Sequence, residues 1–236
     1  ASSRIGVTNG LSVIFAIPPT IYLALRDEKN WKKIFISMFV FGVLFLFPFD
    51  LIAEYTRTWD TLSYIFSYHI AGVELTVDNL IWGMLMTMYT FVFYQHFVSR
   101  DKTSQISPRL VYVAILSIIV TFVIITILFK YPMFFSWRYP YLVLGMLAIL
   151  PPLALGFRKP SYIPRMTIIV IYFSLFYFIQ ELFGVGFHYW TYSGNNYIGW
   201  VNVMGITFPF EELYFWMLWY APTLISYYEI FVNNEG

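Results

Sequence analysis

Three glutamates stand inside long apolar stretches in the second half of the chain. Glu181 lies in the segment 176–190, and Glu211 and Glu212 lie in the segment 209–216. A charged side chain at membrane depth costs about 2.5–3.5 kcal/mol, so an acid kept there is a candidate for function. Carboxylates that share a low-dielectric site cannot all be ionised. We therefore expect at least one of them to keep its proton and to take part in general acid–base chemistry.

A second group of acids, in the first half of the chain, has matching spacing. Eight residues separate Asp50 from Trp59, and eight residues separate Glu181 from Trp190. Glu54 follows Asp50 by four positions, so a helix places both acids on one face. The sequence therefore predicts that acids from both halves contribute to one site.

Further landmarks recur at a nearly constant offset. A proline pair at 18–19 returns at 151–152, and a glycine–acid segment at 72–80 returns at 205–213, both 133 positions later. The acid–tryptophan spacing recurs at 131 positions, a slip that a loop can absorb. A period this long in a membrane chain indicates an internally duplicated bundle. In this alignment Asp78 is the counterpart of Glu211.

The composition is that of a membrane protein. The 236 residues are 59% hydrophobic and only 11% charged, whereas about a quarter of the residues of a soluble domain are charged. The net charge of +1 and the lack of a long basic run give no indication of a nucleic-acid partner. Runs of the length that crosses the roughly 30 Å of hydrocarbon fall at 10–25, 34–54, 79–98, 110–130, 141–157, 166–187 and 208–231.

The positions of Lys and Arg predict the orientation. Ten of the 14 follow the first, third or fifth run, which places those loops in the cytoplasm, the N-terminus outside and the C-terminus inside. The ten are Arg26, Lys29, Lys32, Lys33, Arg100, Lys102, Arg109, Arg158, Lys159 and Arg165. The other four, Arg4, Arg57, Lys130 and Arg138, are then on the outer side.

The predicted fold is a single all-α membrane domain over residues 1–236. It has seven transmembrane helices in a 3+1+3 order, with two three-helix repeats, 10–98 and 141–231, and a linker helix at 110–130. Because the linker is one helix, both repeats run in the same direction through the bilayer. Counterpart acids then meet at one depth.

Aromatic residues accompany the acids along the sequence. Their π-faces stabilise a developing cation by about 0.5–2 kcal/mol, although the same residue types also form packing and interfacial belts. A protonated acid, aromatic walls and membrane depth together indicate protonation of an alkene and handling of a carbocation in an apolar substrate. The expected substrate-binding residues are Trp59, Trp190, Tyr214, Phe215, Trp216 and Tyr177.

The segment 209–215 has the form P-x-E-E-x-x-F. With the acid-x8-Trp helices and the duplicated three-helix units, it resembles the small membrane lycopene cyclases of archaea, fungi and actinobacteria. In actinobacteria the two halves are separate subunits, whereas here they would be fused. The resemblance implies redox-neutral closure of the ψ-ends of lycopene to β-ionone rings in carotenoid biosynthesis, without cofactor or metal, by a multi-pass protein of a prokaryotic plasma membrane.

The resemblance also implies partners and roles. The implied partners are lycopene and the lipid bilayer. The resemblance also allows protein partners, either a second copy of this chain or other enzymes of the carotenoid pathway. Segment 76–79 departs from the Pro-x-acid-acid pattern and leaves a single acid there in the first copy. This departure puts the catalytic role of the first copy in question. The implied proton donor is Glu212 or Glu211, the implied relay or base is Glu181 or Asp50, and Asp78 and Glu54 tune the cluster.

Other functions are open on sequence. The 3+1+3 order is shared with SWEET-type transporters, so a SWEET-like transporter or an apolar-ligand-binding protein is one alternative. A carotenoid hydratase or an isoprenoid isomerase would use the same proton chemistry. A retinal protein is disfavoured because segment 208–231 has no lysine, and the three histidines, His69, His96 and His188, are too dispersed to indicate a metal site.

Overall fold

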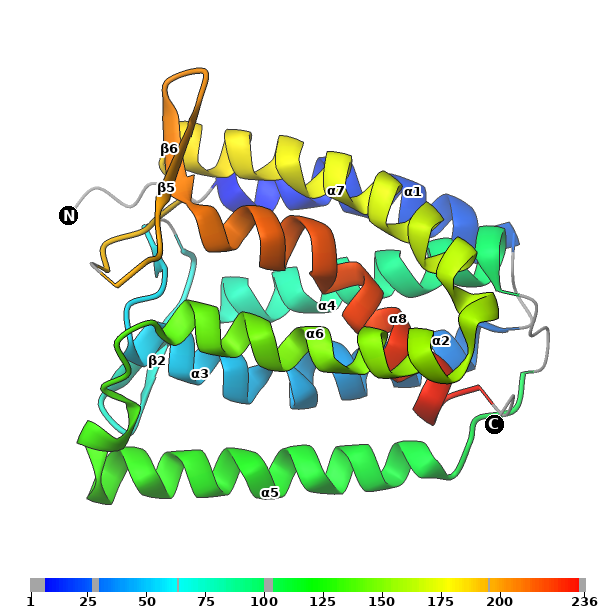
Figure 1. Ribbon diagram of the computed structural model, residues 1–236, viewed down its shortest axis with the longest axis horizontal. Helices are drawn as coiled ribbons and strands as arrows, with labels where there is room; N and C mark the ends of the chain where they lie inside the picture. The colour runs from blue at the N-terminus through cyan, green and yellow to red at the C-terminus, as the bar shows by residue number, and fades with distance from the viewer. Residues whose placement is uncertain (1–6, 27–29, 63, 100–103, 195, 234–236) are drawn as a thin grey trace.

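The computed structural model describes residues 7–26, 30–62, 64–99, 104–194 and 196–233. This part of the chain is mostly helical and forms long helical rods packed side by side (Figure 1). The rods of the first half are α1 (Val7–Arg26), α2–η2–α3 (Trp31–Phe39, Val40–Phe45 and Phe47–Tyr55) and α4–η3 (Val77–Phe93 and Tyr94–Val98). They are followed by α5 (Arg109–Lys130), α6 (Pro140–Arg158), α7 (Ile163–Gly186) and η6–α8 (Glu212–Trp219 and Tyr220–Phe231), with short 3-10 turns η4 (Pro132–Phe135) and η5 (Pro160–Tyr162).

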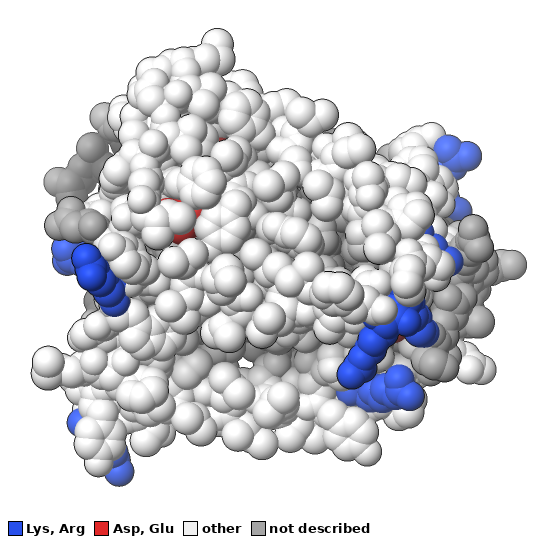
Figure 2. Space-filling model, in the orientation of Figure 1, with Lys and Arg blue, Asp and Glu red and all other residues white. Residues whose placement is uncertain are grey.

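Four helical stretches are long and apolar enough to cross a membrane. They are Trp31–Tyr55, Arg109–Lys130, Pro140–Arg158 and Pro160–Gly186. Lys and Arg gather at the two ends of the face in Figure 2 and leave its middle without them. These helices confirm the part of the prediction that describes a mostly helical membrane protein. Of the residues used for orientation, Arg4, Lys29, Arg100 and Lys102 lie outside the described residues.

Three short antiparallel ladders stand at one end of the bundle (Figure 1). They are β1 (Asp60–Thr61) with β4 (Trp190–Thr191), β2 (Ser67–Ile70) with β3 (Val73–Thr76), and β5 (Trp200–Val203) with β6 (Ile206–Pro209). The all-α prediction did not include them, because strands of two to four residues give too little alternation to be recognised. Phe208 and Pro209, expected in the last helix, end β6 instead, and the helical backbone begins at Phe210.

The two hairpins have the same geometry 133 positions apart. The β2–β3 turn has positive φ at Ala71 (54°) and Gly72 (80°), and the β5–β6 turn has positive φ at Met204 (54°) and Gly205 (83°). Positive φ at both central residues is the requirement of a type I′ hairpin turn, which glycine meets without steric cost. Each hairpin leads directly into a helix, α4 in the first half and η6–α8 in the second.

The β1–β4 ladder joins the two halves. Asp60 pairs with Thr191, 131 positions later, and Thr61 pairs with Trp190. Residues 131 positions apart are counterparts in the alignment of the acid–tryptophan segments. When counterpart residues of two halves face each other in an antiparallel ladder, a twofold axis that relates the halves passes between them. The ladder therefore brings Trp59 and Trp190, one from each half, to the same place.

The π-helix η2 and the helix α4 approach each other closely at Gly42 and Gly83. A Cβ added at Gly42 would lie 3.1 Å from Met84 Cα and 3.2 Å from the carbonyl oxygen of Gly83. Both obstacles are backbone atoms, which cannot rotate away as a side chain can. A residue larger than glycine at position 42 would therefore push the two rods apart.

We expect Gly42→Ala to destabilise the protein by about 1–3 kcal/mol, the usual cost of overpacking. Gly156→Ala, in α6, is the matched control, because the nearest atom to its added Cβ is Ile163 Cγ1 at 3.9 Å. The control should be neutral or stabilising by up to about 1 kcal/mol, since alanine favours helix. Thermal unfolding of both variants in detergent measures the difference, and equal losses would contradict the close-packing account.

Candidate functional site

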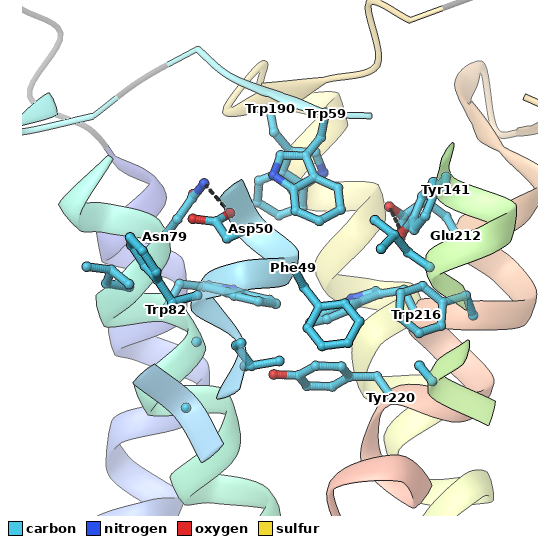
Figure 3. Close-up of a pocket in the computed structure, with 18 of the residues that line it drawn as sticks. Phe49, Asp50, Trp59, Asn79, Trp82, Tyr141, Trp190, Glu212, Trp216 and Tyr220 are labelled. Carbon is cyan, nitrogen blue, oxygen red and sulfur yellow. Dashed lines mark hydrogen bonds between the residues drawn. The ribbon is translucent and has the colours of Figure 1, made fainter. Parts of the chain in front are cut away.

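A cavity of about 180 Å³ lies between the two halves of the bundle (Figure 3). Its acids stand near the β1–β4 ladder, and its walls away from the ladder are apolar, with Phe45, Phe49, Leu144 and Leu224 among them. The predicted site residues that line it are Asp50, Asp78, Glu181, Glu212, Trp59, Trp190, Phe215 and Trp216. Glu54, Glu211, Tyr214 and Tyr177 lie outside its lining.

Glu181 is held by two donors from the segment that follows its helix. Trp190 Nε1 donates to both carboxylate oxygens, at 3.3 and 3.2 Å, and the Tyr192 hydroxyl donates to Oε1 at 2.7 Å. Burial, and next the charge of Glu181, raise the pKa of the Tyr192 phenol well above its ordinary value. The Tyr192 hydroxyl therefore stays protonated and serves as a donor throughout the neutral range.

Glu212 begins the π-helix η6 and reaches the cavity from the opposite wall to Asp50 (Figure 3). The Tyr141 hydroxyl donates to its Oε1 at 2.5 Å, and only 4% of Glu212 is exposed. Glu181 and Glu212 are near enough to interact electrostatically. A π-helical turn is rare and is found most often at functional sites, and here it carries Glu212, Phe215 and Trp216.

The acids of the first half share one amide group. Asn79 Nδ2 donates to Asp50 Oδ1 at 3.3 Å and to Glu54 Oε1 at 3.0 Å. The Thr61 hydroxyl donates to Asn79 Oδ1 at 3.0 Å, which fixes the amide with its N–H groups toward the acids. The second oxygen of Asp50, Oδ2, is buried and accepts no hydrogen bond from the described residues.

Asp78 and Glu211 each accept a hydrogen bond from a loop in their own half of the chain. Asp78 Oδ2 accepts from the backbone N–H of Ile65 at 2.9 Å, and Glu211 Oε1 accepts from the N–H of Ile198 at 2.8 Å. Donor and acceptor positions both differ by 133 between the two contacts. Each acid stands in the first turn of a helix, where a carboxylate is also favoured by the helix dipole. The placement indicates that these two acids fasten the loops over the cavity.

Aromatic rings surround the acids. Trp59 and Trp190 lie above the cavity, on the side of the ladder (Figure 3), and Trp82 and Trp216 pack directly against each other in its wall, with ring centroids 4.6 Å apart. Tyr177 stacks on Trp216 at 5.0 Å from outside the lining and supports that ring. The Tyr214 hydroxyl instead donates to the carbonyl oxygen of Leu142 at 3.4 Å, so this residue joins α6 to η6.

Sequence reasoning did not assign several of the lining residues to the site, among them Asn79 and four other polar or aromatic residues. Tyr141 and Tyr192 are the donors to the glutamates, Thr61 orients Asn79, and Tyr220 places its ring 4.0 Å from Trp216. Thr61 and Tyr192 each follow a site tryptophan by two positions. Aligning the two copies residue by residue would have singled out this pair, whereas Tyr141 carries no comparable signal.

Comparison of the chain with protein-family models, with curated proteins and with solved structures finds no match. The functional conclusion therefore comes from the cavity itself. Its acids can exchange protons with a bound molecule, its rings can face a cation, and its remaining walls are mostly apolar. A proton-transfer reaction on a hydrocarbon uses all three properties.

Trp190 packs directly on Gly184, and we expect Gly184→Ala to displace it. An added Cβ would lie 1.9 Å from Cη2 of the indole ring, so the ring must move and withdraw Nε1 from Glu181. We expect a loss of about 1–3 kcal/mol in stability and a changed near-ultraviolet circular dichroism spectrum. Gly186→Ala is the control, because its Cβ meets only the flexible end of Ile206, at 3.1 Å. An unchanged spectrum for Gly184→Ala would argue against this packing role.

Proposed function

We propose that this chain is an integral-membrane lycopene cyclase, which closes the ψ-ends of lycopene to β-ionone rings. The observation that carries the proposal is the grouping of Asp50, Glu181 and Glu212 around one apolar, tryptophan-lined cavity. Acids at this depth are costly, and the chain supplies them with dedicated donors from Asn79 and Tyr141 among others. Such a site suits a substrate that is itself apolar and must be protonated.

The reaction is a proton cycle. The O–H bond of a cavity carboxyl group breaks as the terminal alkene of the substrate takes up the proton, which leaves a tertiary cation. The internal alkene attacks this cation with its π electrons and closes the ring. A carboxylate then removes a ring proton, and the electrons of that C–H bond form the ring double bond. Electrons stay within the substrate, so the reaction is redox-neutral, and the tryptophan rings that line the cavity, Trp59, Trp190 and Trp216 among them, stabilise the cation.

The size of the cavity supports entry of one substrate end at a time. Pockets that enclose a whole drug-sized ligand measure about 300–1,000 Å³, and this cavity measures about 180 Å³. A C40 polyene is larger still, so only its end group fits between the acids. The apolar walls below the acids, with Phe45 and Leu224, suit the start of the hydrocarbon chain.

The proposal includes the membrane topology. All seven rods cross the bilayer as two parallel three-helix repeats around α5, with the N-terminus outside and the C-terminus in the cytoplasm. Support comes from the hairpins that share one geometry at an offset of 133, and from the counterpart pairing of Asp60 with Thr191. Two halves related in this way bring Asp50 and Glu181 to one depth.

We expect cells that accumulate lycopene to form β-carotene, through a monocyclic intermediate, when they express this chain. Replacing Asp50 by Asn and both Glu181 and Glu212 by Gln in one variant should lower ring formation at least about 100-fold, because general acid–base groups contribute 10²–10⁴-fold. Chromatography of extracted carotenoids measures both products.

The matched control is Glu74→Gln. Glu74 is exposed on β3 and outside the cavity lining, where its Oε1 accepts from the Tyr64 hydroxyl at 3.0 Å. This variant should cyclise lycopene as the parent does. Unchanged ring formation in the triple variant of Asp50, Glu181 and Glu212 would contradict the proposal. Movement of lycopene between vesicles without conversion would favour the transporter instead.

A further inference from the structure

The two acid sites of the cavity are counterparts but differ in their hydrogen bonds. At offsets of 131 and 133, Asp50 corresponds to Glu181, Thr61 to Tyr192, and Asn79 to Glu212. Both sites face the same cavity from opposite halves. The donors at these equivalent places differ, and the difference sets the two acids apart.

Glu181 has the surroundings of an anion. Its two oxygens receive three contacts from Trp190 Nε1 and the Tyr192 hydroxyl, at 3.3, 3.2 and 2.7 Å. An indole N–H can only donate, so it binds an ionised carboxylate oxygen more strongly than the hydroxyl oxygen of a carboxylic acid. Hydrogen bonds that point at both oxygens stabilise the charged form of a carboxylate.

Asp50 has the surroundings of a neutral acid. Oδ1 accepts one amide N–H from Asn79, while Oδ2 is buried and accepts no hydrogen bond from the described residues. A buried ionised oxygen without a partner is costly, and more so than a neutral one. Glu54 shares the same amide, so ionising both carboxyl groups would place two negative charges side by side. A proton on Oδ2 removes the buried charge and its repulsion with Glu54, and it leaves Oδ1 as the acceptor.

We propose that Asp50 is the proton donor of the cavity and that Glu181, across it, is the carboxylate that faces the cation and takes a proton back. This assignment rests on the proposed cyclase function and differs from the expectation that Glu211 or Glu212 donates. Glu211 lies outside the lining, where it binds the N–H of Ile198.

Each step balances. The Oδ2–H bond of Asp50 breaks, and the π electrons of the terminal alkene form the new C–H bond. Ring closure moves the positive charge to the ring, and an oxygen of Glu181 removes the ring proton while the C–H electrons become the double bond. A proton then passes from Glu181 back to Asp50 before the next ring, so none is consumed.

Asn79 is the positioning residue in this account. Its amide holds Oδ1 of Asp50, and Thr61 prevents the amide from turning, through a contact at 3.0 Å. The counterpart position in the second half carries Glu212. The departure of the first copy from the Pro-x-acid-acid pattern thus gives Asp50 an N–H donor where the second copy has an acid.

Infrared spectroscopy of the purified protein tests the resting proton without any substrate. At neutral pH we expect a C=O stretching component of a protonated carboxyl group that shifts in D₂O. Asp50→Asn should remove it, and Glu181→Gln should leave it in place. Asn79→Leu should move it to higher frequency, because the C=O group loses its hydrogen bond. A component that survives Asp50→Asn, whichever other carboxyl group carries it, would overturn the assignment, and an unmoved component in Asn79→Leu would remove Asn79 from it.

Products separate the two roles during turnover. Asp50→Asn should leave lycopene acyclic, with ring formation at least about 100-fold lower, while the absorption spectrum of bound lycopene shows that the variant is folded. Glu181→Gln should still consume lycopene but form a different mixture of ring isomers or hydrated products, because the cation loses its proton elsewhere. An altered mixture from Asp50→Asn, or intact lycopene with Glu181→Gln, would overturn the proposal.

The two tests fail in different ways. If the parent chain leaves lycopene unchanged, the cyclase function and these catalytic roles fall together, and the infrared result still decides which carboxyl group holds the proton. If the parent chain forms rings while the infrared component belongs to Glu181, only the assignment of roles fails.

Discussion

Keeping carboxyl groups inside an apolar bundle is the constraint on which this structure depends. Each acid at membrane depth must find hydrogen-bond donors or hold a proton, because desolvation otherwise outweighs the packing around it. The donors to Glu181 come from the segment that includes β4, and those to Asp50 and Glu212 come from the first residues of neighbouring helices. The short ladders at this end of the bundle are therefore part of the site, since they fix the segments that supply these groups.

The relation between the halves explains why the acids meet. Asp60 faces its counterpart Thr191 in the ladder, so equivalent side chains approach one another near it. Close packing at Gly42 and Gly184 lets rods and rings come together around a common space. In the proposed function the halves no longer do the same work, because one site holds its acid through an amide and the other through phenol and indole donors. Asymmetry within a duplicated frame provides a donor and an acceptor in one cavity.

Much of this frame could be predicted from the sequence. Long apolar runs mark the rods to within a few residues, since membrane helices need uninterrupted apolar length, and the acids cluster as their spacing indicates. Three things could not be predicted. The hairpins are too short for a periodic signal. Neighbours such as Glu211 and Glu212 differ by about 100° around a helix, so the sequence could not say that only Glu212 lines the cavity. Tyr141, a partner far away in the chain, reaches Glu212 through tertiary packing alone.

The most direct test of the central claim, that a cavity acid protonates an alkene, is a single turnover of lycopene by the purified protein after exchange in D₂O, with the protein in excess over lycopene. Mass spectrometry of the cyclised product measures the isotope. The account predicts rings that carry deuterium delivered from the exchanged carboxyl group of the cavity. Rings formed without any deuterium, or lycopene recovered unchanged, would contradict it.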